Sequence, residues 1–249
     1  MGVVYSREEV SGGNVPYPED FEVAARHMLE VFFNHDSDYV ESAMVYGSTA
    51  LGSPSRRSDL DILLVHSREE DLEALAFIHS VLDRTREVYG VHIEPNILSS
   101  GSLMNERAHT IDPLFALHLS RFADDPNWSR NDPLRDLGID IEHGQWRSRE
   151  NLADSAADYL AGKVRKFGGA LAQGFSEQEL KVLQRVFELP HAIGRKLVPA
   201  VMGIEQASVI EDKEASMSIT LDMISHPDYI KPRDAILRLS EMDREYSEI

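Results

Sequence analysis

The chain has 249 residues, 42% of them apolar, which suits one large folded domain or two smaller ones and excludes a disordered protein. It contains no cysteine, which excludes disulfides, thiolate metal sites and thiol catalysis and fits a reducing cytoplasm. The net charge of −18 disfavours broad binding to DNA or RNA and suits a cationic substrate, or a small anion bound together with a divalent metal.

The first half of the chain alternates predicted helices and strands. Its apolar periodicities predict, in chain order, a helix over 18–33, strands over 42–46 and 59–65, a helix over 69–88, a strand over 91–98 and a helix over 112–122. Pro95 is expected to interrupt or end the third strand. Such alternation is typical of a protein that packs helices against a sheet. No apolar run approaches the roughly 18 residues of a membrane span, so none is expected.

The second half is predicted to be entirely helical. Residues 126–148 lie in a stretch rich in proline, glycine and other turn formers, and they are expected to form a linker. Trp128 and Trp146 fall in this linker, where they would either line a cleft or pack between domains. Beyond it, helices are predicted over 149–173, 176–189, 191–202, 212–225 and 232–247. We therefore expect an N-terminal catalytic domain, residues 1–125, and a helical substrate-binding domain, residues 149–249.

Two aspartates interrupt the apolar run of the second predicted strand, in the stretch "SDLDILLV". In a strand, Asp59 and Asp61 project from the same face, while the alternate leucines and isoleucine turn to the other face and pack against helices. Neighbouring carboxylates repel each other unless a cation lies between them, and carboxylate oxygens suit Mg²⁺ or Mn²⁺. The pattern therefore predicts a metal site, with a solvent-facing strand end as the alternative.

A possible phosphate site precedes the aspartates. Gly47 and Ser48 end the first predicted strand, and a short helix is expected to start in the residues that follow. Backbone N–H groups at such a turn, together with a hydroxyl, can approach phosphate oxygens. Arg56 and Arg57 in the following loop either add positive charge against phosphates or are simply solvated.

The stretch from Gly47 to Val65 resembles the signature of the DNA polymerase β-like nucleotidyltransferase superfamily. The shared features are the Gly-Ser pair, a loop containing Gly52, and an Asp-x-Asp preceded by Ser58. The resemblance covers roughly residues 20–125. It implies an α+β fold in which helices flank a mixed sheet, here followed by the all-helical second domain.

The resemblance also implies the reaction and the residues that perform it. A nucleoside monophosphate passes from an NTP, with ATP expected, to an acceptor hydroxyl, and pyrophosphate is released. Asp59 and Asp61 would hold two Mg²⁺ ions, with Mn²⁺ as a substitute, and such a pair of ions stabilises both the attacking and the leaving oxygen. Glu94 would hold one of the ions and take the proton of the acceptor. Gly47 and Ser48 would bind the β- and γ-phosphates.

Three further residues complete the expected site. Arg57 and Ser58 are predicted to contact the nucleotide. His92 lies on the same face of the third predicted strand as Glu94, and it is the alternative third site residue.

The two-domain layout is similar to that of aminoglycoside and related antibiotic nucleotidyltransferases, in which the acceptor binds between the domains. A chain of net charge −18 suits such a cationic acceptor. The alternatives are a toxin-type enzyme that modifies a protein or a tRNA, and a nucleotide-binding antitoxin or regulatory subunit. No membrane partner is expected.

The helical half offers only weak functional patterns, and the roles of their residues stay open. A basic cluster, which is either a solvated helix face or a phosphate contact, consists of Lys163, Arg165 and Lys166. Arg185 and His191, followed by Arg195, resemble the ribonuclease motif of HEPN domains. Pro190 would disturb a helix there, so His191 is expected to be structural.

Overall fold

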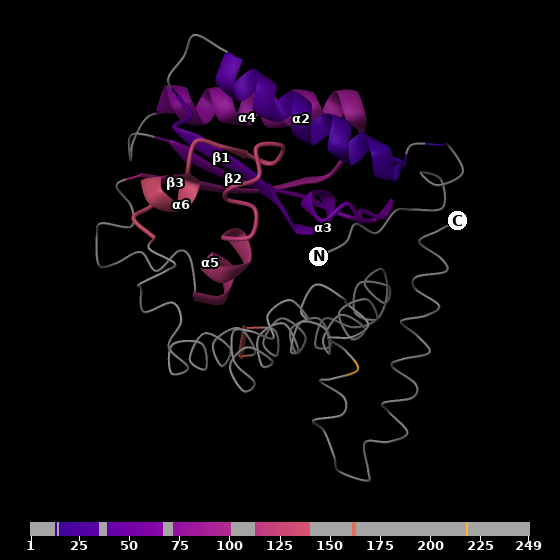
Figure 1. Ribbon diagram of the computed structural model, residues 1–249. Coiled ribbons are helices and arrows are strands. Elements are labelled where there is room, and N and C mark those ends of the chain that lie inside the picture. The colour runs from indigo at the N-terminus through magenta and orange to yellow at the C-terminus, as the bar shows by residue number, and fades with distance from the viewer. Residues whose placement is uncertain are drawn as a thin grey trace. The chain divides into compact units, whose positions relative to one another are not determined.

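The computed structural model of the protein (Figure 1) describes Gly13 and residues 15–34, 39–66, 72–100, 113–139, 161–162 and 218. The chain divides into two compact units, Met1–Gly144 and Gln145–Ile249. Almost all described residues belong to the first unit. The helices predicted after residue 149 therefore lie outside the described residues, apart from 161–162 and 218, which are helical. The basic cluster of the helical half, Arg185, His191 and Arg195 lie outside them as well.

The first unit combines helices with a mixed sheet of four strands, which confirms the expected α+β class. In chain order its elements are α2 (Pro18–Asn34), β1 (Ser42–Tyr46), α3 (Gly47–Ala50), β2 (Leu60–His66), α4 (Leu72–Tyr89), β3 (Ile93–Ser99), α5 (Pro113–Leu119), β4 (Ser129–Arg130) and α6 (Pro133–Asp136). The strand order is β3-β2-β1-β4. β2 and β3 run parallel, whereas β1 is antiparallel to both β2 and β4.

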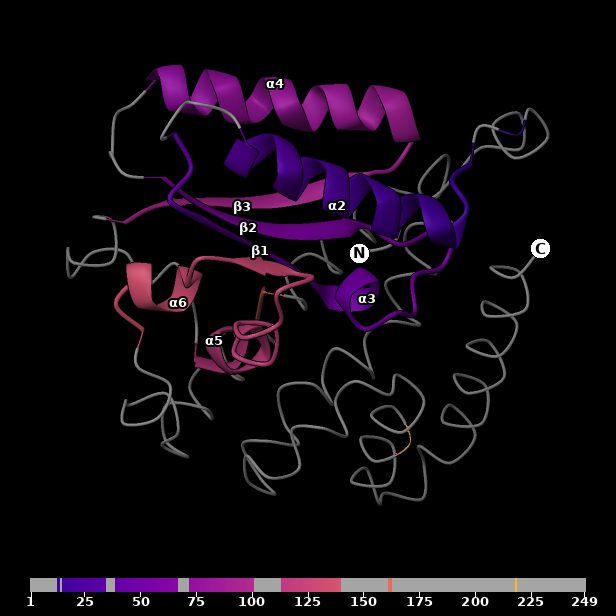
Figure 2. The same cartoon turned by 45° about the horizontal axis from the view of Figure 1, so that its top comes forward.

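Helices cover both faces of the sheet. Figure 2 shows α2 and α4 on one face and α5 and α6 on the other. On the first face, Leu60, Ile62 and Leu64 of β2 are fully buried in one apolar cluster with residues of α2 and α4. The sequence-based prediction that these three side chains pack against helices is therefore confirmed. None of the helices in the described part of the chain is long and apolar enough to cross a membrane.

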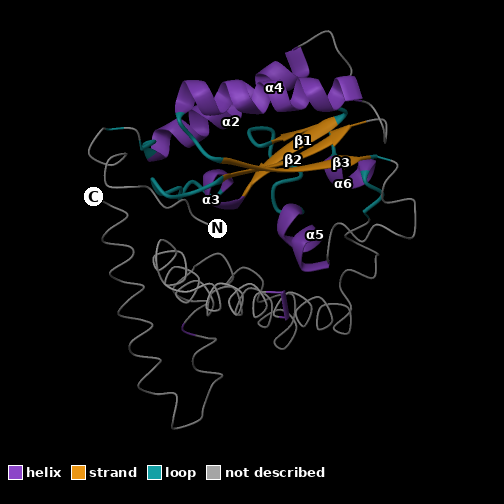
Figure 3. Ribbon diagram, turned by 180° about the vertical axis from the view of Figure 1, so that it is seen from behind, coloured by secondary structure: helices purple, strands orange, loops and turns teal. Residues whose placement is uncertain are grey.

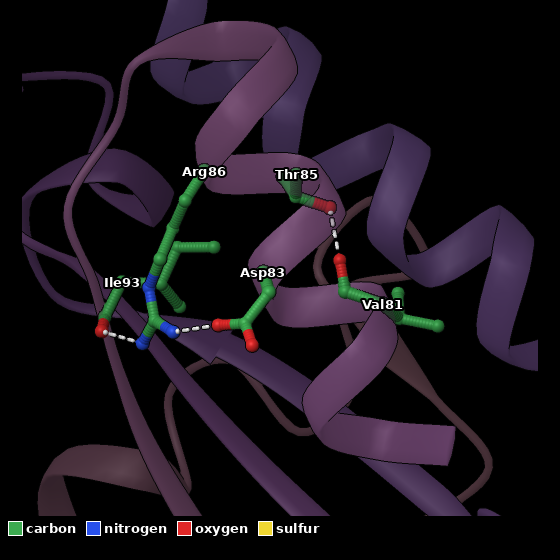
Figure 4. Close-up of polar contacts among 5 residues, drawn as sticks. All are labelled: Val81, Asp83, Thr85, Arg86 and Ile93. Atoms are coloured by element: carbon green, nitrogen blue, oxygen red, sulfur yellow. Dashed lines mark hydrogen bonds and ion pairs between the residues drawn. The ribbon is translucent and has the colours of Figure 1, made fainter. Parts of the chain in front are cut away.

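A polar connection fixes the start of β3 under α4. Gly90 ends the helix with a φ of +67°, a left-handed conformation that glycine adopts without strain. The guanidinium of Arg86 donates to the carbonyl of Ile93 at 2.9 Å and also binds Asp83 at 2.7 Å (Figure 4). Within α4, the hydroxyl of Thr85 donates to the carbonyl of Val81. Arg86 therefore ties the last turn of α4 to the first residue of β3.

Pro95 lies inside β3 rather than at a break. Its register partner is Ile62 of β2, and the strand continues to Ser99. In the described sheet β3 is an edge strand, and one side of its backbone needs no strand partner. An edge strand can therefore accept a residue without an N–H, which is why the expected interruption is absent.

The prediction of a linker over 126–148 is wrong for its first part, because residues up to 139 pack on the sheet of the first unit. β4 pairs with β1, and the carbonyl of Trp128 accepts a hydrogen bond from the backbone N–H of Val45 at 2.8 Å. The Trp128 ring lies in the apolar cluster, so packing explains it. The helix α6, capped by the Asp132 side chain, follows β4, and Figure 3 shows α6 beside the sheet. The prolines and glycines of this stretch therefore indicate turns between short strands and helices. Residues 140–148, Trp146 included, lie outside the described part.

Candidate functional site

The predicted site residues gather where β1 ends and β2 and β3 begin. Tyr46 is the register partner of Asp61, and Asp61 is the register partner of Glu94. Residues directly opposite each other on neighbouring strands project from the same face of a sheet. Tyr46, Asp61 and Glu94 therefore form one row across three strands. This row lies on the face opposite to Ile62, away from the buried layer under α2 and α4.

Gly47 brings the phosphate-binding turn against the Asp61 carboxylate. Its φ is +72°, and a Cβ atom placed on it would lie 2.2 Å from Oδ2 and 3.1 Å from Cγ of Asp61. A side chain at this position would overlap the carboxylate, so only glycine fits without movement. Gly52 has a similar φ of +70° but nothing within 4 Å of its would-be Cβ. The two glycines therefore differ: one permits a close approach, the other only a turn.

Asp59 lies just before β2, and His92 contacts it. Only 5% of the Asp59 side chain is exposed, compared with 54% of the His92 side chain. Oδ1 of Asp59 is 3.1 Å from Nδ1 of His92, and the backbone N–H of Leu60 donates to the carbonyl of His92 at 2.8 Å. The two residues considered for the third site position thus differ: His92 binds Asp59, whereas Glu94 is the neighbour of Asp61 and has an exposed side chain.

The loop between α3 and β2 is held by its own serines. The hydroxyl of Ser58 accepts the backbone N–H of Ser55 at 2.8 Å, and the backbone N–H of Ser58 donates to the carbonyl of Ser55. The backbone N–H of Arg57 donates to the hydroxyl of Ser55 at 3.3 Å. Ser58 therefore shapes the turn that delivers Asp59 to the sheet. That Ser58 and Arg57 contact nucleotide stays a prediction.

Arg56 binds the segment that precedes α2. Its guanidinium donates to the carbonyls of Val15 and Pro16 at 3.1 and 3.3 Å and lies over the ring of Tyr17, 4.8 Å from its centre. The sequence suggested either a phosphate contact or a solvated side chain for Arg56, and neither alternative describes this arrangement. The side chain anchors residues far away in sequence, a relation that no local pattern indicates.

Tyr46 is a site neighbour that the sequence analysis did not single out. Its hydroxyl accepts a hydrogen bond from the side-chain amide of Asn96 on β3. Its ring contacts Phe115 and His118 of α5, with centroids 5.3 and 6.1 Å away. Tyr46 directly precedes Gly47 and faces Asp61 across the strands, so strand register, had it been known, would have indicated it.

The chemistry of the carboxylates fits the divalent metal that the superfamily resemblance implies. Asp59, Asp61 and Glu94 supply oxygen donors, which Mg²⁺ prefers, and the lack of a Cβ at Gly47 lets the Asp61 carboxylate lie against the turn. Among the described residues, however, no three acidic or histidine side chains lie close enough together to hold a metal ion as they stand. For all three carboxylates to hold one ion, some of them would have to turn about their side-chain bonds, as aspartate and glutamate side chains can.

Comparison with known protein families identifies the domain that contains these residues. Residues 29–104 match the family model described as a nucleotidyltransferase domain, and this range contains Gly47, Asp59, Asp61 and Glu94. No curated protein matches the chain. The match covers the strands β1, β2 and β3 that carry the site. Residues 29–104 therefore form a nucleotidyltransferase domain of the DNA polymerase β-like superfamily, which supports a general role in nucleotide transfer.

Proposed function

We propose that the protein is a metal-dependent enzyme that transfers a nucleoside monophosphate from an NTP, with ATP expected, to a hydroxyl of a small acceptor. The observation that carries this proposal is the close approach of the Asp61 carboxylate to Gly47, where a Cβ would lie only 2.2 Å from Oδ2. It brings a turn suited to phosphate binding against a side chain suited to metal binding. A nucleotide–metal complex needs both groups side by side, whereas a purely structural strand end needs neither.

In the proposed reaction, the acceptor oxygen forms a bond to the α-phosphorus of the NTP. The bond from that phosphorus to the oxygen bridging to the β-phosphate breaks, and pyrophosphate leaves. Glu94, whose side chain is exposed at the start of β3, takes the proton of the acceptor hydroxyl. The backbone N–H groups at Gly47 and Ser48 bind the β- and γ-phosphates. Arg57 and Ser58 are proposed as further nucleotide contacts.

Asp59, Asp61 and Glu94 are the proposed metal-holding residues. When bound there, Mg²⁺ or Mn²⁺ supplies positive charge that stabilises the oxygens of the displacement. The chain itself contributes the fixed positions of the carboxylates: Asp61 and Glu94 through strand register, and Asp59 through the serine turn that precedes β2. The nucleotide is therefore received on strands whose other face is buried, which limits movement of the site.

The acceptor is proposed to be a cationic small molecule, of which an aminoglycoside is one. The formal net charge of −18 supports this class, because acidic residues near a site attract ammonium groups. The residues after 149 are proposed to bind the acceptor. We further propose that the protein works in the cytoplasm, where NTPs and Mg²⁺ are present.

The test is pyrophosphate release with each NTP and Mg²⁺ against a panel of acceptors: aminoglycosides, lincosamides, tRNA and the protein itself. Asp61→Asn is expected to lower the rate about a thousandfold or more, since metal stabilisation of the transferring group contributes several kcal/mol. Glu87→Gln is the matched control, because Glu87 makes an exposed ion pair with Arg84 on α4, away from the carboxylates.

Two outcomes oppose the proposal. Turnover that survives in Asp61→Asn would show that the carboxylate row does not carry the reaction. Nucleotide binding without release for any acceptor would favour the alternative of a regulatory nucleotide-binding subunit.

A further inference from the structure

We infer that His92 is a positioning residue that restricts the rotation of the Asp59 carboxylate, one of the proposed metal-holding groups. This inference rests on the proposed function, because it concerns the same metal-holding carboxylates. It goes beyond that function by giving His92 a task of its own rather than a place among the ligands.

The contact between the two side chains has a defined direction. An ionised carboxylate can only accept hydrogen bonds, so the Nδ1–H of His92 donates to Oδ1 of Asp59 across 3.1 Å. This bond commits one of the two carboxylate oxygens to the imidazole. It also fixes the rotation of the carboxylate, which otherwise turns freely about its last bond. The direction of the second oxygen is thereby restricted before any metal binds.

The environments of the two residues differ in the way that a positioning role requires. Only 5% of the Asp59 side chain is exposed to solvent, whereas 54% of the His92 side chain is exposed. A carboxylate so deeply buried loses water as a partner and depends on protein donors to set its orientation. An exposed histidine has no such need of its own. The interaction therefore serves the carboxylate.

The backbone around His92 is fixed from two sides. Its carbonyl accepts the N–H of Leu60, the residue that follows Asp59, at 2.8 Å. The next residue, Ile93, is bound through its carbonyl by the guanidinium of Arg86, as Figure 4 shows. His92 is therefore joined to the Asp59–Leu60 segment by a backbone bond and a side-chain bond. A histidine held so firmly can impose an orientation on the carboxylate that it contacts.

Partners of this kind have a measurable effect in metal sites. Groups that hydrogen-bond metal-ligating side chains fix the ligand, and removing them costs about 10- to 100-fold in metal affinity or activity. A merely structural bond would instead alter the unfolding temperature and leave metal affinity unchanged. The two roles are therefore separated by measuring metal binding directly.

The experiment uses the full chain and the near-isosteric pair His92→Asn and His92→Leu. Asparagine presents an N–H close to the position of Nδ1, and leucine has nearly the same shape without a donor. Mn²⁺ binding is measured by water proton relaxation enhancement, with each NTP present and no acceptor, so that nothing turns over. His79→Leu is the control, because His79 is exposed on α4. Thermal unfolding is recorded for every variant.

We expect His92→Leu to bind Mn²⁺ about 10- to 100-fold more weakly than the wild type, and His92→Asn to recover most of the loss. Equal Mn²⁺ affinity in all three proteins, or equal weakening in both variants, would overturn the inference. Asp61→Asn separates this from failure of the proposed function. If that variant alone loses Mn²⁺, the function stands and the inference falls. If the wild type binds no Mn²⁺ with any NTP, both fall.

Discussion

Alternate residues of one strand, β2, perform different tasks on the two faces of the sheet. On one face, Leu60, Ile62 and Leu64 are completely removed from solvent beneath α2 and α4. On the other, Asp61 stands in a row with Tyr46 and Glu94 and touches the Gly47 turn. The helix-covered face carries stability, and the carboxylate face carries the proposed chemistry. Substitutions on the two faces should therefore have separable effects.

The largest stability effect is expected from Ile62→Ala. Ile62 is fully buried, so removing its side chain loses apolar burial and leaves a cavity, at a cost of about 2–5 kcal/mol in the free energy of unfolding. Ile62→Val, which removes a single methylene, should cost only about 0.5–1.5 kcal/mol. Urea unfolding measures both.

Asp61→Asn, the neighbour on the other face, should change unfolding by much less than Ile62→Ala while abolishing turnover. A loss of stability in Asp61→Asn equal to that of Ile62→Ala would break the comparison, because both faces would then support the fold.

Gly47→Ala sharpens the comparison from the carboxylate side. The new methyl group would lie 2.2 Å from Oδ2 of Asp61, so the carboxylate has to move. A misplacement of about 1 Å in a catalytic group can cost about a hundredfold, and this is the loss expected in pyrophosphate release. The left-handed backbone adds strain of about 1–2 kcal/mol to the unfolding free energy.

Gly52→Ala is the matched control for Gly47→Ala. It has nearly the same φ, +70° against +72°, but no atom near the added methyl group. It should lose similar stability and keep its activity. Equal activity loss in both variants would mean that loop strain, and not the approach of Gly47 to Asp61, governs the rate.

The two faces also show which features of the fold could be predicted from the sequence. Period-two alternation in "DLDILLV" predicted both faces of β2, and the loop between two strands predicted where Gly47 and Asp61 would be found. These features depend on neighbours within about twenty residues. The packing of Trp128 and β4 on β1, and the bond from Arg56 to Val15, join residues far apart in the chain. Local composition contains no signal for such contacts, which is why it predicts a linker over 126–148 although residues up to 139 pack on the sheet.

The pairing of His92 with Asp59 belongs to an intermediate case. The sequence predicted that His92 lies on the same face of its strand as Glu94, but it did not predict which residues of β2 and β3 pair. Parallel strands joined by a helix can pair in several registers, and the hydrophobic pattern of one strand alone does not fix which is adopted. Only the observed register, Asp61 with Glu94, brings His92 beside Asp59.

Arg56→Ala should have a moderate effect that falls on stability. The side chain donates two hydrogen bonds to backbone carbonyls and lies over the Tyr17 ring, and it is partly buried. Its loss should cost about 1–2 kcal/mol in the free energy of unfolding. The KM for NTP should change little. Arg57→Ala should show the reverse, with a raised KM and little change in stability. A raised KM in Arg56→Ala would place Arg56 on the nucleotide instead.

Arg86→Met is expected to have the smallest effect of the series. Methionine keeps an unbranched apolar stem but removes the bonds to Ile93 and Asp83. Because the Arg86 side chain is 36% exposed, the loss should be about 1 kcal/mol in the free energy of unfolding. Arg84→Met is the control, since Arg84 makes only an exposed pair with Glu87, and it should cost at most about 0.5 kcal/mol.

The informative measurement on Arg86→Met is its rate relative to its stability. Arg86 comes from the helix-covered side, yet its bond ends on the first residue of β3, next to His92 and Glu94. If the two faces are independent, the rate of pyrophosphate release should follow the small change in stability and remain near that of the wild type. A rate loss of tenfold or more in a protein that is still fully folded would show that α4 positions the start of β3. The helix-covered face would then affect the reaction as well as the stability, through the start of β3.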